Sequence, residues 1–246
     1  MPGRSRRHQP SSLLDLPQDL CLEIAVRVGA TSEGPLADLR SLRGTCSTMR
    51  RVCGHGNVGR RLSIEGIRDE ISWVWDPTAY KAFLAMLTDL GNPEACFFSG
   101  IKAVFMENRG CNDLRRAAEG GHDAAAYLYA ILLYRDNGGA AADDTAKRYM
   151  RRVAGGGSTT SRWLSNEGCL PLREKAARAI HSSTWRIWGE PLPPLAQVRG
   201  DQPCAGNGGC CGVDKGWLGI SLFCCEDCRL RCEMVKFERS IGIGNQ

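Results

Sequence analysis

The segment Leu114-Arg-Arg-Ala-Ala-Glu-Gly-Gly-His122 recurs 36 residues further along the chain as Met150-Arg-Arg-Val-Ala-Gly-Gly-Gly-Ser158. A second pair, Gly91-Asn-Pro-Glu-Ala95 and Gly121-His-Asp-Ala-Ala125, is offset by 30 residues. Offsets near 34 residues are typical of repeats that are each built from two helices. The matches therefore predict a stack of helical hairpins, with an ordinary irregular helical domain as the alternative.

Helix-start and helix-end signals extend this pattern in both directions. Asp76-Pro77 combines a good N-cap residue with a proline in the first turn, and Pro93 opens a further helix. We expect additional helices that end at Gly120 or run over about 123–135, 144–154 and 172–188. The sequence therefore predicts an all-α fold.

The composition of the chain changes along its length and predicts five segments. Three prolines, Pro191, Pro193 and Pro194, predict a stiff linker ahead of a cysteine-rich tail. The predicted segments are a disordered basic tail over 1–11, a short helical module over 12–60, a helical repeat domain over 70–190, a proline-rich linker over 191–203 and a zinc module over 204–240.

Two apolar stripes characterise the N-terminal module. The first repeats every four residues and the second repeats in steps of three and four: Leu16, Leu20, Ile24 and Val28, then Leu39, Leu42, Cys46, Met49 and Cys53. Each stripe predicts one amphipathic helix. Two helices of this length cannot bury both apolar faces against each other alone, so we expect a partner chain to cover them. The alternative is that they cap the repeat domain that follows.

Composition and motifs exclude several classes of function. The 246 residues are 43% hydrophobic and 24% charged, which is ordinary for a globular chain, and the net charge of +5 is too small to indicate nucleic-acid binding. The longest uncharged apolar run is too short to cross a bilayer, and no secretory signal is expected. No phosphate-binding loop or nucleophile elbow is present. We therefore expect a non-enzyme located in the nucleus, the cytoplasm or both.

Cysteine is the one residue type with an abnormal frequency. Seven of the thirteen cysteines lie between Cys204 and Cys232, and a dense cluster in a reducing compartment favours a metal site over disulfides. The tail has no histidine, so a zinc site there would use sulfur ligands alone. The candidate ligands are Cys204, Cys211, Cys224 and Cys228, with Cys232 as a possible fourth or alternate ligand.

The N-terminal module resembles an F-box. Leu16-Pro-Gln-Asp-Leu-Cys-Leu-Glu-Ile24 is similar to the first half of that motif, and Asp38-Leu-Arg-Ser-Leu-Arg-Gly-Thr-Cys46 is similar to its second half. Met49 stands where the family often has Trp or Phe. The whole layout is similar to a plant F-box family in which Sel-type helical repeats and a MYND-like zinc tail follow the box. Within that tail, Cys225 stands where Ser is common and Cys232 where His is common.

This resemblance implies a substrate-receptor subunit of a Skp–cullin–F-box ubiquitin ligase. Such a subunit binds a Skp-type adaptor and an unknown protein substrate, and it carries no catalytic residue. The residues that the resemblance assigns to adaptor binding are Leu16, Pro17, Leu20, Ile24, Leu39, Leu42 and Met49. The alternative is a protein-interaction scaffold that works independently of a ligase through its repeats and zinc module. Nucleic-acid binding by the basic residues of the tail is the weakest hypothesis.

Overall fold

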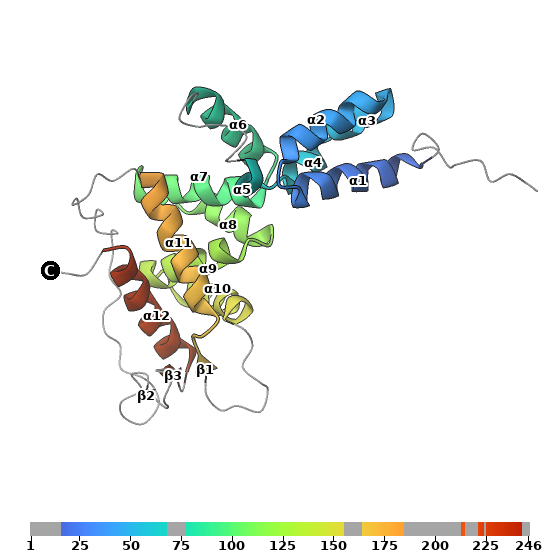
Figure 1. Cartoon of the computed structure of the whole chain (residues 1–246). Coiled ribbons are helices and arrows are strands. Elements are labelled where there is room, and N and C mark those ends of the chain that lie inside the picture. Colours follow the sequence, from blue (N-terminus) through green and yellow to red (C-terminus); the bar gives the residue numbers. More distant parts are fainter. Residues whose placement is uncertain are drawn as a thin grey trace, which may run out of the picture. The chain divides into compact units, whose positions relative to one another are not determined.

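The structure is a computed structural model, and it describes residues 16–67, 77–154, 164–184, 213–214, 221–223 and 225–242. The chain divides into two compact units, Met1–Asn92 and Pro93–Gln246, and each is described here by itself. Helices make up nearly all of the described residues, as the colours of Figure 1 show along the chain. The predicted all-α fold is therefore confirmed.

The first unit is a bundle of short helices. Its helices are α1 (Gln18–Thr31), α2 (Pro35–Thr45), α3 (Ser47–Cys53), α4 (Gly56–Arg61), α5 (Ile64–Ile67) and α6 (Pro77–Asp89). Helix α1 packs against α2, α3 and α4. The helices approach closely at Gly29, where a Cβ atom would lie 3.3 Å from Cδ1 of Leu62. The core of the unit is therefore built around small residues of α1.

The single helix predicted over the second apolar stripe is wrong, because the chain breaks at Cys46. This residue is extended, with φ −162° and ψ 169°, and its Sγ accepts a hydrogen bond from the backbone N–H of Met49 at 3.4 Å. Cys46 thus acts as the N-cap of α3 and starts a new helix instead of continuing α2. Met49 is fully buried in the first unit as a result.

Helix α6 begins at Pro77, as predicted from Asp76-Pro77, and ends in a turn at Gly91, where φ is +78°. The next residue, Asn92, is buried, and its side-chain amide donates hydrogen bonds to the carbonyls of Gly59 at 2.9 Å and Leu62 at 2.8 Å. Asn92 therefore ties the end of the first unit to α4.

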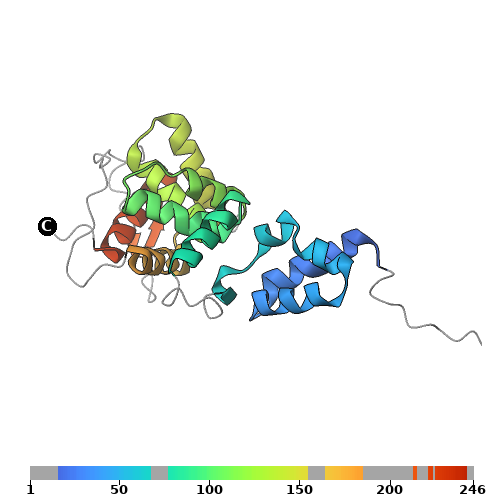
Figure 2. The same ribbon diagram turned by 90° about the horizontal axis from the view of Figure 1, so that it is seen from above.

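The second unit contains five helices of the repeat region, a small sheet and a C-terminal helix. They are α7 (Pro93–Phe105), α8 (Asn112–Glu119), α9 (Asp123–Asp136), α10 (Ala140–Val153), β1 (Leu164–Ser165), α11 (Cys169–Thr184), β2 (Val213–Asp214), β3 (Ser221–Phe223) and α12 (Glu226–Ser240). The strands pair antiparallel in the order β1-β3-β2, with Leu164 opposite Phe223. Figure 2 shows α11 and α12 side by side against the other helices of this unit.

The turns before α7 and α9 have the same backbone geometry. Gly91 and Gly121 both have positive φ, and the residue after each one donates its N–H five residues back, Asn92 to Leu87 at 2.9 Å and His122 to Ala117 at 3.0 Å. The sequence match at an offset of 30 residues therefore marks one repeated turn. The hairpin of α7 and α8 recurs as that of α9 and α10, while residues 155–158 of the other match lie outside the described residues.

Helix α9 is the centre of the second unit. Eleven of its fourteen residues are buried, and it packs against α8, α10, α11 and α12. His122 caps it, because Nδ1 accepts the N–H of Ala125 at 3.0 Å, and the imidazole stacks on Phe97 with ring centroids 4.4 Å apart. Burial, with a contribution from Lys175, lowers the pKa of His122 to about 4. The prediction that His122 is a loop or cap histidine is confirmed.

Candidate functional sites on α1 and in the C-terminal tail

The residues predicted to bind an adaptor divide into an exposed set and a buried set. Leu20 is 49% exposed on α1, whereas Leu39 is 7% exposed and Met49 is 0% exposed. Pro17 is exposed, and three further positions are partly buried: Leu16, Ile24 and Leu42. Leu39 and Met49 therefore belong to the core of the first unit, and the expectation that the whole of both stripes is left uncovered does not hold.

The inward face of α1 is a stripe of small residues. Cys21, Ala25 and Gly29 are buried at four-residue steps and face α2, α3 and α4. Leu20 and Ile24 each precede a residue of this inward face by one position. Their side chains therefore point to the side of α1 and not directly at α2, α3 and α4. The four-residue spacing of Cys21, Ala25 and Gly29 could have predicted this close helix contact from the sequence. The more conspicuous four-residue spacing of Leu20 and Ile24 favoured a different face.

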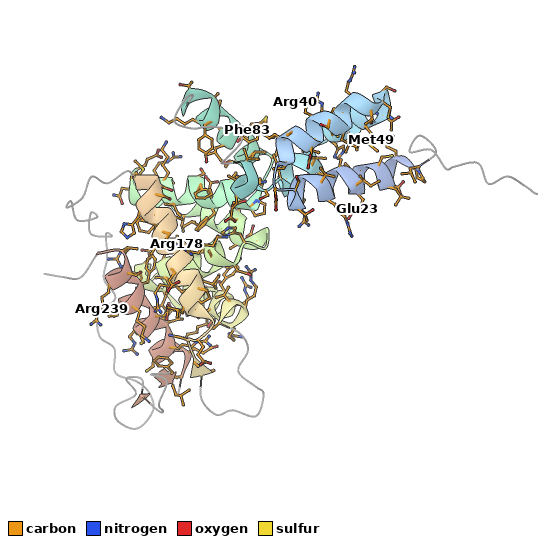
Figure 3. The ribbon with its side chains drawn as sticks, in the orientation of Figure 1. Glu23, Arg40, Met49, Phe83, Arg178 and Arg239 are labelled. Carbon is orange, nitrogen blue, oxygen red and sulfur yellow. The ribbon has the colours of Figure 1, made fainter. Side chains whose placement is uncertain are left out.

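Charged side chains surround the uncovered part of α1. Glu23 and Arg27 form an exposed ion pair at 3.0 Å on α1, and Arg51 of α3 donates to the side chain of Gln18 at 3.4 Å. Figure 3 shows Glu23 and Arg40 on the outer faces of α1 and α2, while Met49 points inward. An exposed leucine bordered by charged groups has the anatomy of a contact surface with an apolar centre and a polar rim.

The predicted zinc ligands fall partly outside the described residues. Cys204, Cys211 and Cys224 lie there, whereas Cys228 is buried and Cys232 partly buried on α12. Within the described ranges, no group of three or more His, Cys, Asp or Glu side chains is arranged to hold a metal ion. The zinc site therefore stays a prediction.

Cys225 has a structural role that sequence reasoning missed. It is the N-cap of α12, since it is extended and its Sγ accepts the backbone N–H of Cys228 at 3.4 Å. Glu226 and Asp227 occupy the first turn, where negative charge is favourable. The cap and the acidic first turn explain why α12 starts at Glu226.

A buried polar network joins α12 to the repeat helices, and no sequence motif predicted this network. The carboxylate of Glu233 is 0% exposed, and it accepts hydrogen bonds from the Tyr127 hydroxyl at 2.9 Å and from Arg173 Nη1 at 3.0 Å. Burial raises the pKa of Glu233, and the nearby Arg173 partly offsets that increase. A buried carboxylate with two donors from different helices therefore orients α12 on those helices.

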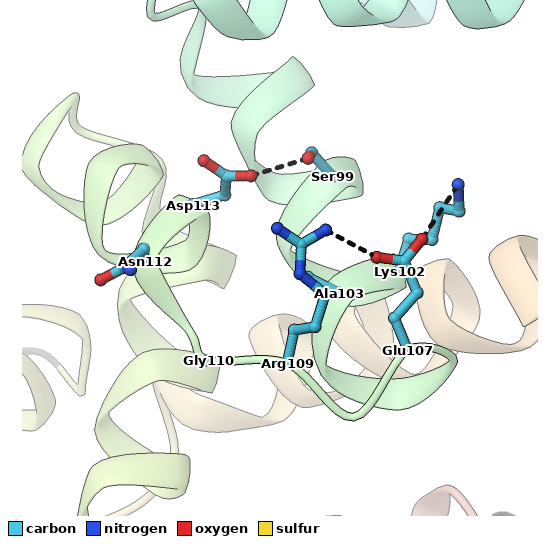
Figure 4. Close-up of a pocket in the computed structure, with 8 residues that line it drawn as sticks. All are labelled: Ser99, Lys102, Ala103, Glu107, Arg109, Gly110, Asn112 and Asp113. Carbon is cyan, nitrogen blue, oxygen red and sulfur yellow. Dashed lines mark hydrogen bonds and ion pairs between the residues drawn. The ribbon is translucent and has the colours of Figure 1, made fainter.

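A polar pocket of about 540 Å³ lies beside the α7–α8 turn (Figure 4). Its charged groups already pair with one another: Glu107 contacts Lys102 at 3.2 Å and Arg109 at 3.0 Å, and Ser99 donates to Asp113 at 2.7 Å. The residues that line the pocket therefore bind one another, and they include no histidine and no cysteine.

Comparison with known proteins is consistent with this architecture. Residues 68–162 match the family of plant tetratricopeptide repeats. The matched range runs from before α6 to beyond α10, so it includes both helical hairpins of the repeat. The repeat-like character predicted from the internal matches is therefore confirmed for this region.

Two curated relatives are proteins of Arabidopsis thaliana that are named as F-box proteins. At1g67623 is 36% identical over 135 residues, which cover 53% of this chain and 43% of the relative. At1g67340 is 31% identical over 152 residues, which cover 54% of this chain and 39% of the relative. The chain thus matches less than half of each relative. No solved structure matches it, and no helix among the described residues has the length and apolar character needed to span a membrane.

Proposed function

We propose that this chain is the substrate-receptor subunit of a Skp–cullin–F-box ubiquitin ligase. The first unit binds a Skp-type adaptor through α1, and the second unit carries the surface that recruits a protein target. The names of the two relatives support this assignment, as does the resemblance of residues 16–46 to an F-box. The repeats, which we propose are of Sel type, provide stacked helices, and stacks of this kind offer extended binding surfaces.

The observation that carries the proposal is the exposure of Leu20. Leu20 is 49% exposed in the first turn of α1, and with Leu16 and Ile24 only partly buried beside it, apolar surface is left uncovered on α1. Covering that surface is favourable by about 25 cal/mol per Å². A Skp-type adaptor is the partner that an F-box would bind through this surface.

The function requires no catalytic residue in this chain. A receptor that holds its target beside a charged conjugating enzyme raises the effective concentration of the target lysine. The roles of the chain's own residues are to bind and to orient. Leu20 and its neighbours contact the adaptor, while the core residues Leu39 and Met49 keep α2 and α3 packed against α1.

Co-expression with a Skp-type adaptor, followed by size-exclusion chromatography, tests the proposal. We expect the wild-type chain and the adaptor to elute as one complex, and the Leu20→Asp variant to elute apart from it. Met86→Asp is the matched control, because Met86 is also 49% exposed, on α6 of the same unit. Separate elution of the wild-type chain and the adaptor would refute the proposal.

The alternative function is a protein-interaction scaffold that works without a ligase. Burial of Leu39 and Met49 within the first unit favours it, because a unit that already has its own core has less need of a partner. In that case a partner would be retained by the Leu20→Asp variant and would depend on the repeats or the cysteine tail.

We also propose that the tail is a MYND-like module that binds Zn²⁺ through Cys204, Cys211, Cys224 and Cys228, with Cys232 as a fourth or alternate ligand. Thiolates are suitable ligands, and Zn²⁺ would supply a structural cross-link. Native mass spectrometry of the reduced protein tests this, with one bound zinc expected in the wild type and none in Cys228→Ser. A metal-free wild type would refute the zinc proposal and leave the adaptor proposal intact.

A further inference from the structure

Helix α12 covers a surface of the second unit that is lined by basic side chains. Four cations from three helices each pair with one carboxylate of α12. Nε of Arg135 lies 2.8 Å from Glu238, and Nζ of Lys147 lies 3.0 Å from Asp227. The other two pairs are Arg151–Glu226 at 2.7 Å and Arg173–Glu233 at 3.0 Å. We call the surface of Arg135, Lys147, Arg151 and Arg173 the basic face.

The same side of α12 also carries its apolar anchors. These are nearly completely buried and follow one helical stripe: Leu230, Met234, Phe237 and Ile241. Phe237 packs edge-on against Tyr127 of α9 with ring centroids 6.0 Å apart. On the other side of the helix, Val235 is 40% exposed. Helix α12 therefore lies on the repeat helices as an amphipathic ligand lies on a receptor.

The contact is more polar than an ordinary core. Glu233 and Arg229 are both buried, and in the part of the chain that the structure describes, Nε and Nη2 of Arg229 have no hydrogen-bond partner. Buried polar atoms without partners cost free energy, so this contact is weaker than an apolar contact of equal area. Complementary charge, in contrast, supplies specificity for the sequence that binds.

We propose that the basic face is a docking site for an amphipathic helix whose inward side carries carboxylates, that α12 occupies it within the chain, and that a helix of a partner protein displaces α12. The structure defines the partner's chemistry. It carries apolar anchors in the pattern of Leu230, Met234 and Phe237, and carboxylates at the positions of Glu233 and Glu238. This site lies in the second unit and does not depend on adaptor binding by α1.

Hydrogen exchange on the intact wild-type chain tests whether α12 detaches. Amides of α12 are expected to exchange at least tenfold faster than those of the central helix α9, because α12 opens while the repeat helices stay folded. Equal protection of α12 and α9 would overturn the proposal, since α12 would then leave the basic face only when the whole unit unfolds.

Binding of a labelled peptide tests whether the vacated face accepts a helix. The probe has the sequence of residues 225–242, with its three cysteines replaced by alanine. The full-length Glu233→Lys variant is expected to bind it at least tenfold more tightly than the wild type, and Val235→Lys, on the exposed side of α12, is expected to match the wild type. A peptide with Lys at its four acidic positions is expected not to bind. Equal affinity of Glu233→Lys and wild type for the probe peptide would contradict the proposal, and if Glu233→Lys fails to fold, the exchange measurement decides alone.

Discussion

The hydroxyl of Tyr127 donates a 2.9 Å hydrogen bond to Glu233 across 106 residues of sequence. This bond joins the central helix of the repeat to the C-terminal helix, and Arg173 of α11 adds a third element to the same carboxylate. Both Tyr127 and Glu233 are 0% exposed. Apolar residues of α12 therefore pack in the same core as the repeat helices.

Removing the Tyr127 hydroxyl is expected to destabilise the second unit. Tyr127→Phe keeps the ring packed on Phe237 and leaves the buried Glu233 with one donor fewer, which costs about 1–3 kcal/mol. Urea denaturation followed by circular dichroism measures the change. Tyr129→Phe is the control, because it keeps the ring contact with Tyr149 and lies on the same helix. Equal stability of the Tyr127→Phe variant and the wild type would show that the bond contributes nothing.

The partly buried His122 predicts a loss of stability in mild acid. The pKa of His122 is about 4 in the folded chain, below its ordinary value of 6.5, because burial opposes the charged form. Between these two values the unfolded chain binds more protons, so stability is present above pH 6.5 and is lost as the pH falls toward 4.

The His122→Asn variant isolates this effect, because asparagine also caps helices and has no titrating group. Chemical denaturation from pH 4 to 7 is expected to give a flatter profile for the variant than for the wild type. His55→Asn is the control, because His55 also caps a helix, α4, but at an exposed position. It measures the effect of replacing a capping histidine by asparagine. Parallel profiles for His122→Asn and the wild type would contradict the assignment.

The contact between α7 and α8 requires a glycine. A Cβ atom at Gly100 would lie 2.7 Å from both the backbone N and Cγ of Leu114, so Gly100→Ala is expected to lower the unfolding free energy by about 1–3 kcal/mol. Gly110→Ala is the matched control, because nothing lies within 4 Å of a Cβ there. Thermal unfolding of the two variants measures the difference, and similar melting temperatures would rule out the close contact.

The capping role of Cys225 can be separated from metal binding. Serine is a good N-cap, so Cys225→Ser is expected to keep the stability of α12, whereas Cys225→Ala is expected to lose about 1 kcal/mol. Hydrogen exchange of the first turn of α12 and zinc content are measured on both variants. Loss of zinc from both variants, with equal loss of protection, would instead identify Cys225 as a ligand.

The sequence predicted the elements whose boundaries depend on local chemistry. The starts at Pro77 and Pro93 follow from prolines and capping residues, and the repeated turn at Gly91 and Gly121 follows from the internal match. The break at Cys46 was missed, because a cysteine N-cap looks like one more apolar residue in a helical stripe.

Contacts between residues far apart in the sequence could not be predicted from local sequence patterns. The pairing of Leu164 with Phe223 joins two-residue and three-residue strands that are too short to give a periodic signal. Glu233 looks like a solvated charge in the sequence, and only the tertiary fold brings Tyr127 and Arg173 to it. On α1, the leucine period predicted the right helix but not the face that packs inward, which the small residues Ala25 and Gly29 occupy.

The dissociation constant of the complex between the purified full-length chain and a purified Skp-type adaptor, measured by isothermal titration calorimetry, tests the central claim most directly. The account predicts a saturable complex that is weakened at least tenfold by Leu20→Asp and is unchanged by Met86→Asp. Heat of binding that is absent for the wild type, or equal affinity of the wild type and Leu20→Asp, would contradict it.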